Sequence, residues 1–297
     1  GPAGSSAAYH MATLGLDVIL LEKQELGRDK VCGDGLTPSA VRELVSMGVD
    51  TSGWQRNRGL RVIGGGHLLH FPWPEQASFP SYGMARPRAL LDRDLAEHAA
   101  AAGARLLTGV TVTGPVTSPT GRVTGVEARP TNRVAYPGIE VPTTFTAPLV
   151  IDAGGVSARL ATAVGRTKNE RRPMGVAVRA YFRSPRAKDA WMESRLELWD
   201  GKPGKSDLLP GYGWIWSVGE GLVNVGLGSV SSRASATAID YRAVFNRWMD
   251  NVPASWGFTK ENQVGGLVSA ALPMAFNRKP HYADGLMLLG DAGGMVS

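Results

Sequence analysis

The chain has 297 residues, of which 43% are hydrophobic and 20% charged, a composition that is ordinary for an enzyme of one or two folded domains and excludes a disordered chain. Its 32 Lys and Arg against 26 Asp and Glu give a formal charge of +6 without any basic run, so we expect no nucleic-acid partner. A single cysteine, Cys32, excludes an internal disulfide and favours a reducing, cytoplasmic location, and no apolar run reaches the roughly 18 to 20 residues of a membrane span.

The N-terminal part predicts a helix, a strand, a loop and a second helix. After the glycines of GPAG, small and apolar residues recur at helical spacing up to Gly15, which is typical of a helix C-cap. The next seven residues, LDVILLE, are typical of a buried parallel strand and end on Glu22. A loop is expected over residues 27–35, and Thr37-Pro38 would cap and begin the helix SAVRELVSMG.

The middle of the chain mixes short strands with one clear helix. Short apolar runs between Leu60 and Ala85, separated by three glycines, predict strands and a hairpin. The segment PRALLDRDLAEHAAAAGA predicts an amphipathic helix, followed by one or two strands in ARLLTGVTVTGP. Residues 121–147 are typical of an antiparallel meander, and LVIDAGG predicts a buried strand that runs into a glycine turn.

The C-terminal part predicts further antiparallel strands and a last glycine turn. Strands are expected over Met174–Phe182 and Glu193–Trp199, a hairpin in PGYGWIWSVGEGLVNVGLGS and a helix near Ala238–Met249. The segment GLMLLGDAGG is again a buried strand that leads into a glycine turn. Since strand-to-glycine turns recur far apart in the sequence, we predict an α/β fold with discontinuous domains. A cofactor domain would comprise 1–59, 85–170 and 275–297, and a substrate domain with an antiparallel sheet would comprise 60–84 and 171–274.

The glycines at the start of the chain fit a dinucleotide-binding motif. In GxGxxG the second glycine lets the backbone approach a pyrophosphate, and the third allows close helix packing. If Gly1 and Gly4 are these two glycines, with Ala3 between them, the chain begins within its own cofactor motif. Glu22 follows Gly1 by 21 residues, the distance expected of an acid that binds the adenosine ribose. The alternatives are glycines that serve only helix packing and a solvated acid at a strand end.

Several segments taken in order resemble one flavoprotein family. Together they are similar to the geranylgeranyl reductase family, particularly its actinobacterial menaquinone reductases, within the larger group built like para-hydroxybenzoate hydroxylase. The resemblance implies a Rossmann-like domain that binds FAD. The segments that carry it are GPAGS, Glu22-Lys23, RDKVCGDGLTP, RALLDRDLAEHAAAAGA, VIDAGGVSARL, PGYGWIW and LLGDAGG.

The resemblance also implies which residues bind FAD. Gly290 and Asp291 would lie at the ribityl chain, with a helix from about Ala292 directing its N-terminus at the flavin. An Asp N-cap on an ordinary turn and a surface arginine at position 88 are the alternatives for these two regions. Asp152 stands one place earlier than the family's aspartate, which leaves its polar role open, and the family pattern continues beyond Ser297. The full set of implied FAD-binding residues is Gly1, Ala3, Gly4, Glu22, Lys23, Arg28, Cys32, Gly33, Arg88, Val110, Gly154, Gly290 and Asp291.

Two further segments would form the substrate side of the site. Cys32 lies in a loop that the family places beside the flavin ring, where a thiol could donate a proton or pack against the ring; a buried, inert cysteine is the alternative. Tyr212, Trp214 and Trp216 alternate along a strand and share one face. With Gly35, this face would form an apolar slot for a polyprenyl chain, unless it is an ordinary aromatic core. The family carries Phe-Pro where this chain has Trp216-Ser217.

The implied activity is reduction of an isoprenoid C=C bond, in the prenyl tail of menaquinone or in a geranylgeranyl chain. The electron donor would be NAD(P)H or a redox protein, and such a substrate implies contact with the inner face of the plasma membrane. An FAD-dependent monooxygenase remains the main alternative. Since flavin halogenases need a lysine early in the chain and none occurs between Lys30 and Lys168, a halogenase is less favoured. A non-catalytic lipid or flavin carrier is the third class, and no metal site is expected.

Overall fold

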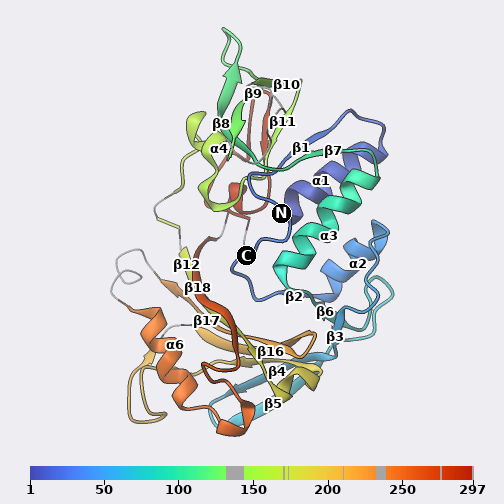
Figure 1. Ribbon diagram of the computed structural model, residues 1–297. Helices are drawn as coiled ribbons and strands as arrows, with labels where there is room; N and C mark the ends of the chain where they lie inside the picture. Colours follow the sequence, from blue (N-terminus) through green and yellow to red (C-terminus); the bar gives the residue numbers. More distant parts are fainter. Residues whose placement is uncertain are drawn as a thin grey trace. The chain divides into compact units, whose positions relative to one another are not determined.

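The structure, a computed structural model, divides into two compact units, each built from separate stretches of the chain (Figure 1). The first unit comprises 1–29, 89–173 and 272–297, and the second comprises 30–88 and 174–271. Compared with the boundaries expected from the sequence, residues 30–59 fall in the second unit rather than with the N-terminal helix. The residues described run from 1 to 295, except 132–143, 170, 173, 210, 232–238 and 275.

The first unit contains a helix–strand–helix–strand layer with a parallel strand pair. The pair is in register with Ile19 opposite Arg105, and a core of small apolar side chains lies beneath it, among them Ala8 and Ala99. The expected helix and strand at the N-terminus are confirmed, and Gly15, with φ +81°, follows the helix end as a C-cap glycine does. The elements are α1 (Pro2–Thr13), β1 (Ile19–Leu21), α3 (Arg88–Ala101) and β7 (Arg105–Leu107).

The remaining strands of the first unit form two small sheets. One is antiparallel, in the order β10-β9-β8; in the other, β11 and β20 run parallel with Asp152 opposite Leu288. Two strands that precede glycine turns, far apart in sequence, therefore pair with each other, which confirms the α/β class. The elements are β8 (Val110–Thr117), β9 (Val123–Pro130), β10 (Thr144–Thr146), β11 (Val150–Asp152), η1 (Gly155–Ser157), α4 (Arg159–Ala163), β19 (Tyr282–Ala283), β20 (Leu286–Leu288) and η4 (Gly290–Gly293).

The second unit is organised by a seven-stranded sheet in the order β18-β12-β17-β16-β13-β4-β5. The hairpins predicted around Gly65 and Gly221 are confirmed as β4–β5 and β16–β17. Sequence patterns missed β18, because its glycines and small residues interrupt the apolar alternation. The strands are β4 (Gly59–Gly64), β5 (His67–Pro72), β12 (Met174–Arg183), β13 (Trp191–Arg195), β16 (Tyr212–Gly219), β17 (Leu222–Ser231) and β18 (Gln263–Pro273).

Helices and short strands cover this sheet. Helix α6 packs Phe245 and Trp248 into a core that also holds Phe182 and Leu227 of the sheet. It begins three residues after the start expected from the sequence, at Tyr241, and residue 238 lies outside the described residues. The other elements are β2 (Gly35–Leu36), α2 (Pro38–Ser46), β3 (Gln55–Asn57), β6 (Gly83–Ala85), η2 (Pro185–Lys188), β14 (Leu198–Trp199), β15 (Leu208–Leu209), α6 (Tyr241–Asp250) and η3 (Ala254–Trp256).

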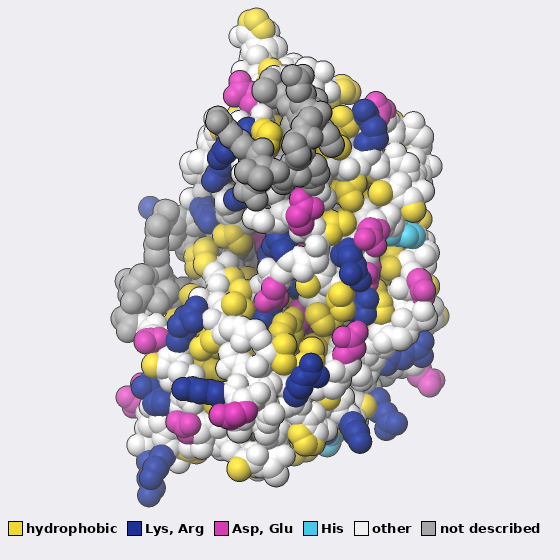
Figure 2. All heavy atoms as spheres, in the orientation of Figure 1, with side chains coloured by type: hydrophobic (Ala, Val, Ile, Leu, Met, Phe, Trp, Pro, Cys, Tyr) yellow, Lys and Arg dark blue, Asp and Glu magenta, His cyan; other side chains and the backbone are white. Residues whose placement is uncertain are grey.

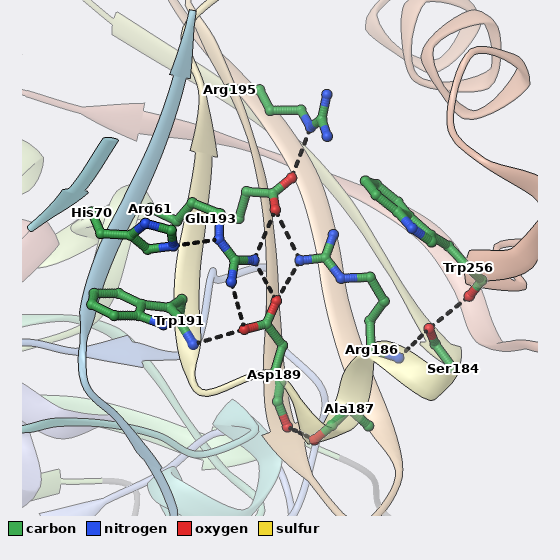
Figure 3. Close-up of polar contacts among 11 residues, drawn as sticks. Arg61, His70, Ser184, Arg186, Ala187, Asp189, Trp191, Glu193, Arg195 and Trp256 are labelled. Carbon is green, nitrogen blue, oxygen red and sulfur yellow. Dashed lines mark hydrogen bonds and ion pairs between the residues drawn. The ribbon is translucent and has the colours of Figure 1, made fainter. Parts of the chain in front are cut away.

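A network of ion pairs joins β4, η2 and β13 (Figure 3). Glu193, 2% exposed, accepts hydrogen bonds from Arg61 at 3.2 Å, Arg186 at 2.8 Å and Arg195 at 2.8 Å. Asp189 accepts from both Arg61, at 2.5 Å, and Arg186, at 2.6 Å. One buried and one half-buried carboxylate thus lie among three guanidinium groups, an arrangement that stabilises the pairing of β13 with β4.

The surface carries mixed charges. On the face shown in Figure 2, Lys and Arg lie scattered among Asp and Glu and do not gather in one basic patch. Within the described part of the chain, no helix is both long enough and apolar enough to cross a membrane.

Candidate functional site

The N-terminal glycines lie at the start of α1, close to two strands of the first unit. Gly1 is the N-cap of the helix and Pro2 its first residue. A Cβ atom added to Gly4 would lie 3.1 Å from the Cβ of Ala153 and 3.7 Å from Cδ1 of Leu20. Gly4 therefore allows the helix to pack closely against β1 and the turn after β11, the role of the third glycine in a dinucleotide motif.

Glu22 follows β1 and places its carboxylate beside the helix start. Its Oε2 lies 3.7 Å from the nitrogen of Gly1, and its Oε1 accepts a hydrogen bond from the N–H of Gln24 at 3.0 Å. Arg28 lies 3.9 Å from the same Oε1. The side chain is 21% exposed, so it can still accept hydrogen bonds from a ligand's hydroxyl groups.

The backbone around Glu22 is held by its neighbours. The N–H of Val110 donates to the Glu22 carbonyl at 3.0 Å, which places Val110 beside the strand end. Lys23 is fixed in the same way, because its carbonyl accepts a hydrogen bond from Oγ1 of Thr131 at 2.8 Å. The structure therefore brings Glu22, Lys23, Arg28 and Val110 close together, and their role in FAD binding stays a prediction.

The late glycine turn approaches the same helix. Gly290 has φ +59°, and a Cβ atom there would lie 2.9 Å from the Cβ of Ala3. The expected α-helix near Ala292 is a 3-10 turn within the described residues, η4, which ends at Gly294 with φ +66°. The expected stabilisation of a reduced flavin by a helix from about Ala292 stays a prediction. Asp291 remains partly exposed beside Gly290.

The buried Asp152 is used within the turn that follows β11. Its Oδ1 accepts the N–H of Gly154 at 2.9 Å, and its Oδ2 accepts the N–H of Ala161 at 3.1 Å. The side chain is 4% exposed. The role that the sequence left open for this aspartate is therefore structural: it fixes Gly154 and the first turn of α4.

These features of the first unit fit FAD. The helix start, the strand-end carboxylate and the Gly290 turn converge, and added Cβ atoms at Gly4 and Gly290 would meet neighbouring side chains. Backbone that a ligand's phosphates can approach, next to a carboxylate that can accept ribose hydroxyls, is what a dinucleotide requires.

In the second unit, the loop that carries Cys32 is held by side chains from the large sheet. Arg179 donates to the carbonyl of Lys30 at 3.2 Å, Asn224 donates to that of Cys32 at 2.9 Å, and Trp216 donates to that of Gly33 at 2.6 Å. The loop therefore follows a path fixed by three strands, β12, β16 and β17.

The predicted aromatic face is present and is largely covered. Trp214 and Trp216 are 5% and 8% exposed, with ring centroids 6.0 Å apart, whereas Tyr212 is 43% exposed. A Cβ atom on Gly33 would lie 2.9 Å from Cζ2 of Trp216, and one on Gly35 would overlap the methyl group of Met192. The two glycines thus let the loop lie directly on the aromatic face. The role of this face in substrate binding stays a prediction.

Asp34 is the main feature that sequence reasoning missed. It is 1% exposed and accepts hydrogen bonds from Tyr181, Asn224 and the backbone N–H of Arg88. Burial raises its pKa to about 6, although hydrogen bonds from Tyr181 and Asn224 and the charge of Arg179 oppose the rise. Arg88 itself is 9% exposed, so it is not the surface arginine of the alternative interpretation.

Comparison with known proteins agrees with this site. Residues 1–240 match the FAD binding domain family. The menaquinone reductase of Mycolicibacterium smegmatis is 36% identical over all of this chain and 69% of its own length. Digeranylgeranylglycerophospholipid reductase 1 of Methanothermobacter thermautotrophicus is 28% identical, also over all of this chain and 69% of its own. A solved structure, a geranylgeranyl bacteriochlorophyll reductase-like protein from Thermoplasma acidophilum, covers 99% of this chain and 69% of that one at 25% identity, with a TM-score of 0.77.

The match to the FAD binding domain includes the start of α1 and the end of β1, and the similarity to the reductases extends over the whole chain. The geometry and the comparisons therefore lead to one assignment. The chain belongs to the FAD binding domain family, within its geranylgeranyl reductase-like group, and is an FAD-dependent oxidoreductase.

Proposed function

We propose that this protein reduces a C=C bond of an isoprenoid chain, with the prenyl tail of menaquinone as the first candidate and a geranylgeranyl chain as the second. The observation that carries the proposal is the 36% identity, over the whole chain, to a menaquinone reductase. The lower identity to a digeranylgeranylglycerophospholipid reductase supports an isoprenoid substrate more broadly.

Bound FAD would supply the hydride. The residues of this chain would bind the cofactor, orient the substrate and exclude water. In the first unit, Gly4 and Gly290 let the start of α1, the turn after β11 and the Gly290 turn approach one another closely, and Glu22 offers an acceptor for ribose hydroxyls. In the second unit, Trp214 and Trp216 supply apolar surface beneath the Cys32 loop.

Isoprenoid substrates of this kind reside in membranes, and the exposed side chains of the β4–β5 hairpin are suited to contact with a membrane surface. Strand β5 is the edge of the large sheet, where Leu68, Leu69 and Phe71 are 54%, 51% and 51% exposed. Residues 55–73 contain three arginines and two histidines but no Asp or Glu. Arg61 is paired with Asp189 and Glu193, whereas the exposed Arg56 and Arg58 would favour an anionic lipid surface. We propose that this hairpin contacts the membrane surface without spanning it.

The deciding experiment uses the complete gene product, loaded with FAD and reduced without oxygen. Long-chain menaquinone and geranylgeranyl diphosphate are offered separately, and mass spectrometry of the recovered lipids reports any gain of two hydrogens. A gain on menaquinone alone supports the first candidate, and a gain on the diphosphate alone supports the second. No gain on either, with the flavin bound and reduced, rejects the reductase proposal and favours an oxygenase, which rapid oxygen uptake with a hydroxylated product would identify.

A further inference from the structure

The loop of residues 30–34 is bound to the large sheet of the second unit by side chains rather than by strand pairing. Arg179, Trp216 and Asn224 each donate to a loop carbonyl, as described above. Asn224 is fixed in turn, because its Oδ1 accepts the indole N–H of Trp214 at 2.8 Å. Since the amide of Asn224 is 0% exposed, no water competes for these bonds.

Asp34 closes this network at the end of the loop. Its Oδ2 accepts hydrogen bonds from the hydroxyl of Tyr181 at 2.5 Å and from Nδ2 of Asn224 at 2.8 Å, and its Oδ1 accepts the N–H of Arg88 at 3.1 Å. Three donors from distant parts of the second unit therefore converge on one buried carboxyl group. Charge-assisted bonds of this kind are about twice as strong as neutral ones.

The backbone at Asp34 shows what the carboxyl group holds in place. Its φ of 63° lies in the left-handed region, which costs about 1 kcal/mol for a residue other than glycine. This conformation directs the N–H of Asp34 at the sulfur of Cys32, with a nitrogen–sulfur distance of 3.3 Å. The hydrogen bonds to the side chain thus offset the backbone strain that places an N–H donor beside the thiol.

We propose that Asp34 is a positioning residue, whose carboxyl group, held by Tyr181 and Asn224, fixes the turn that determines the pose and accessibility of Cys32. Only the importance of Cys32 for catalysis rests on the proposed function, because a reductase of this family would have the Cys32 loop on the substrate side. The hydrogen bonds that order the loop lie within the second unit, and their effect can be measured without a substrate.

The network also makes the loop sensitive to pH. The ionisable or charged groups that face the carboxyl group are Tyr181 and Arg179 on β12 and Cys32 in the loop, with Arg88 approaching through its backbone. The guanidinium of Arg179 lies 4.1 Å from the Tyr181 ring centre. Because burial raises the pKa of Asp34 to about 6, the carboxylate takes up a proton in mildly acidic solution. Because the pKa of Asp34 is higher when its carboxyl group is buried in the network than when it is exposed, protonation favours the ordered loop, and the loop should loosen as the pH rises through about 6.

The chain's single cysteine makes a direct test feasible, since any thiol reagent reports on Cys32 alone. The FAD-loaded complete protein is reacted with dithiodipyridine from pH 4.5 to 8, and each rate is divided by that of N-acetylcysteine at the same pH. For the wild type, we expect this ratio to rise on the order of tenfold as the pH increases through about 6, because loss of the proton from Asp34 disfavours the ordered loop. Asp34→Asn should show a ratio that does not change with pH, because an amide has no proton to lose in this range.

Tyr181→Phe provides a second test that leaves the carboxyl group in place. It should raise the ratio at neutral pH and shift the pH dependence upward, because a hydroxyl that lowers the pKa of Asp34 is gone. Tyr241→Phe is the matched control. Tyr241 is equally buried, and its hydroxyl has no hydrogen-bond partner among the described residues, so its loss should leave the ratio unchanged.

Circular dichroism and flavin absorbance identify variants that fail to fold. If Asp34→Asn does not fold, the wild-type pH profile and the Tyr181→Phe variant still test the proposal. A pH-independent ratio in the wild type, or variants that match Tyr241→Phe, would overturn the assignment. If the wild type reduces no isoprenoid but shows the predicted thiol profile, the proposed function fails while the role of Asp34 stands.

Discussion

Replacing Glu193 by glutamine should destabilise the second unit strongly. The carboxylate is 2% exposed and accepts hydrogen bonds from Arg61, Arg186 and Arg195 (Figure 3). Glutamine keeps the shape of the side chain but removes the negative charge. Arg61 and Arg186 retain Asp189, whereas Arg195 has no second carboxylate among its described ion pairs.

The magnitude follows from the burial of the network. The side chains of Arg186 and Glu193 are 11% and 3% exposed, so water compensates little for the lost charge. Breaking a buried ion pair by removing one partner costs about 3 to 5 kcal/mol, and the lower end applies here because two of the guanidinium groups keep Asp189. A loss of about 3 kcal/mol corresponds to a decrease in melting temperature of roughly 6 to 12 °C for a chain of this size.

The pH dependence separates this effect from a general packing defect. Although burial acts to raise the pKa of Glu193, the hydrogen bonds and charges of Arg186 and Arg195 outweigh it and hold the pKa below the usual 4.5. A lowered pKa in the folded state contributes stability that is complete above pH 4.5 and is lost as the pH falls through the folded value. Wild type and Glu193→Gln should therefore differ fully at pH 7 and converge in acid.

Urea unfolding followed by tryptophan fluorescence at several pH values measures this difference. Glu43→Gln serves as the control, because Glu43 is 56% exposed and pairs only with its neighbour Arg42 among the described ion pairs, a contact worth under about 1 kcal/mol. A Glu193→Gln variant no less stable than Glu43→Gln at pH 7, or a difference that persists unchanged at pH 3, would refute the reasoning.

Three further predictions concern the cofactor, the aromatic face and the membrane. Glu22→Gln should weaken FAD binding by about 10- to 100-fold in a fluorescence titration, the value of charge-assisted hydrogen bonds, and Glu25→Gln should not. Gly226→Ala should cost about 1 to 3 kcal/mol in urea unfolding, because its Cβ would overlap the ring of Trp214; an unchanged midpoint would contradict this packing. Leu68→Ser should reduce co-sedimentation with anionic vesicles on the order of tenfold, and equal binding to neutral vesicles would argue against the charge component.

Much of the fold could be predicted because its signals are local. Thr37 and Pro38 mark the start of α2, where Oγ1 of Thr37 accepts the N–H of Ala40, and the apolar run before Glu22 marks a buried strand. The glycine at position 4 and the acid at position 22 follow a motif whose spacing is itself the signal. β18 was missed because its pairing with β12 depends on the neighbouring strand rather than on its own apolar pattern.

The candidate site was predictable to the extent that its residues belong to one segment. The resemblance points to Cys32, Gly33 and Gly35, but it assigns no role to Asp34, which lies between them. Its partners Tyr181 and Asn224 lie 147 and 190 residues away. Neither partner belongs to any motif, so only the tertiary fold brings them to the carboxyl group.

The two buried carboxyl groups of the second unit show why sequence cannot assign such roles. Glu193 is surrounded by guanidinium groups, which hold its pKa down, whereas Asp34 has mainly neutral donors, so burial prevails and its pKa rises to about 6. Their contributions to stability therefore have opposite signs in acid. As the pH rises from about 4 to about 6, Asp34 loses a proton that the folded state favours, which costs stability; as the pH falls through the folded pKa of Glu193, its ion pairs are lost. A carboxylate that stays charged can hold strands together at all physiological pH values, whereas one that titrates near neutrality is suited to a loop whose order changes with its protonation.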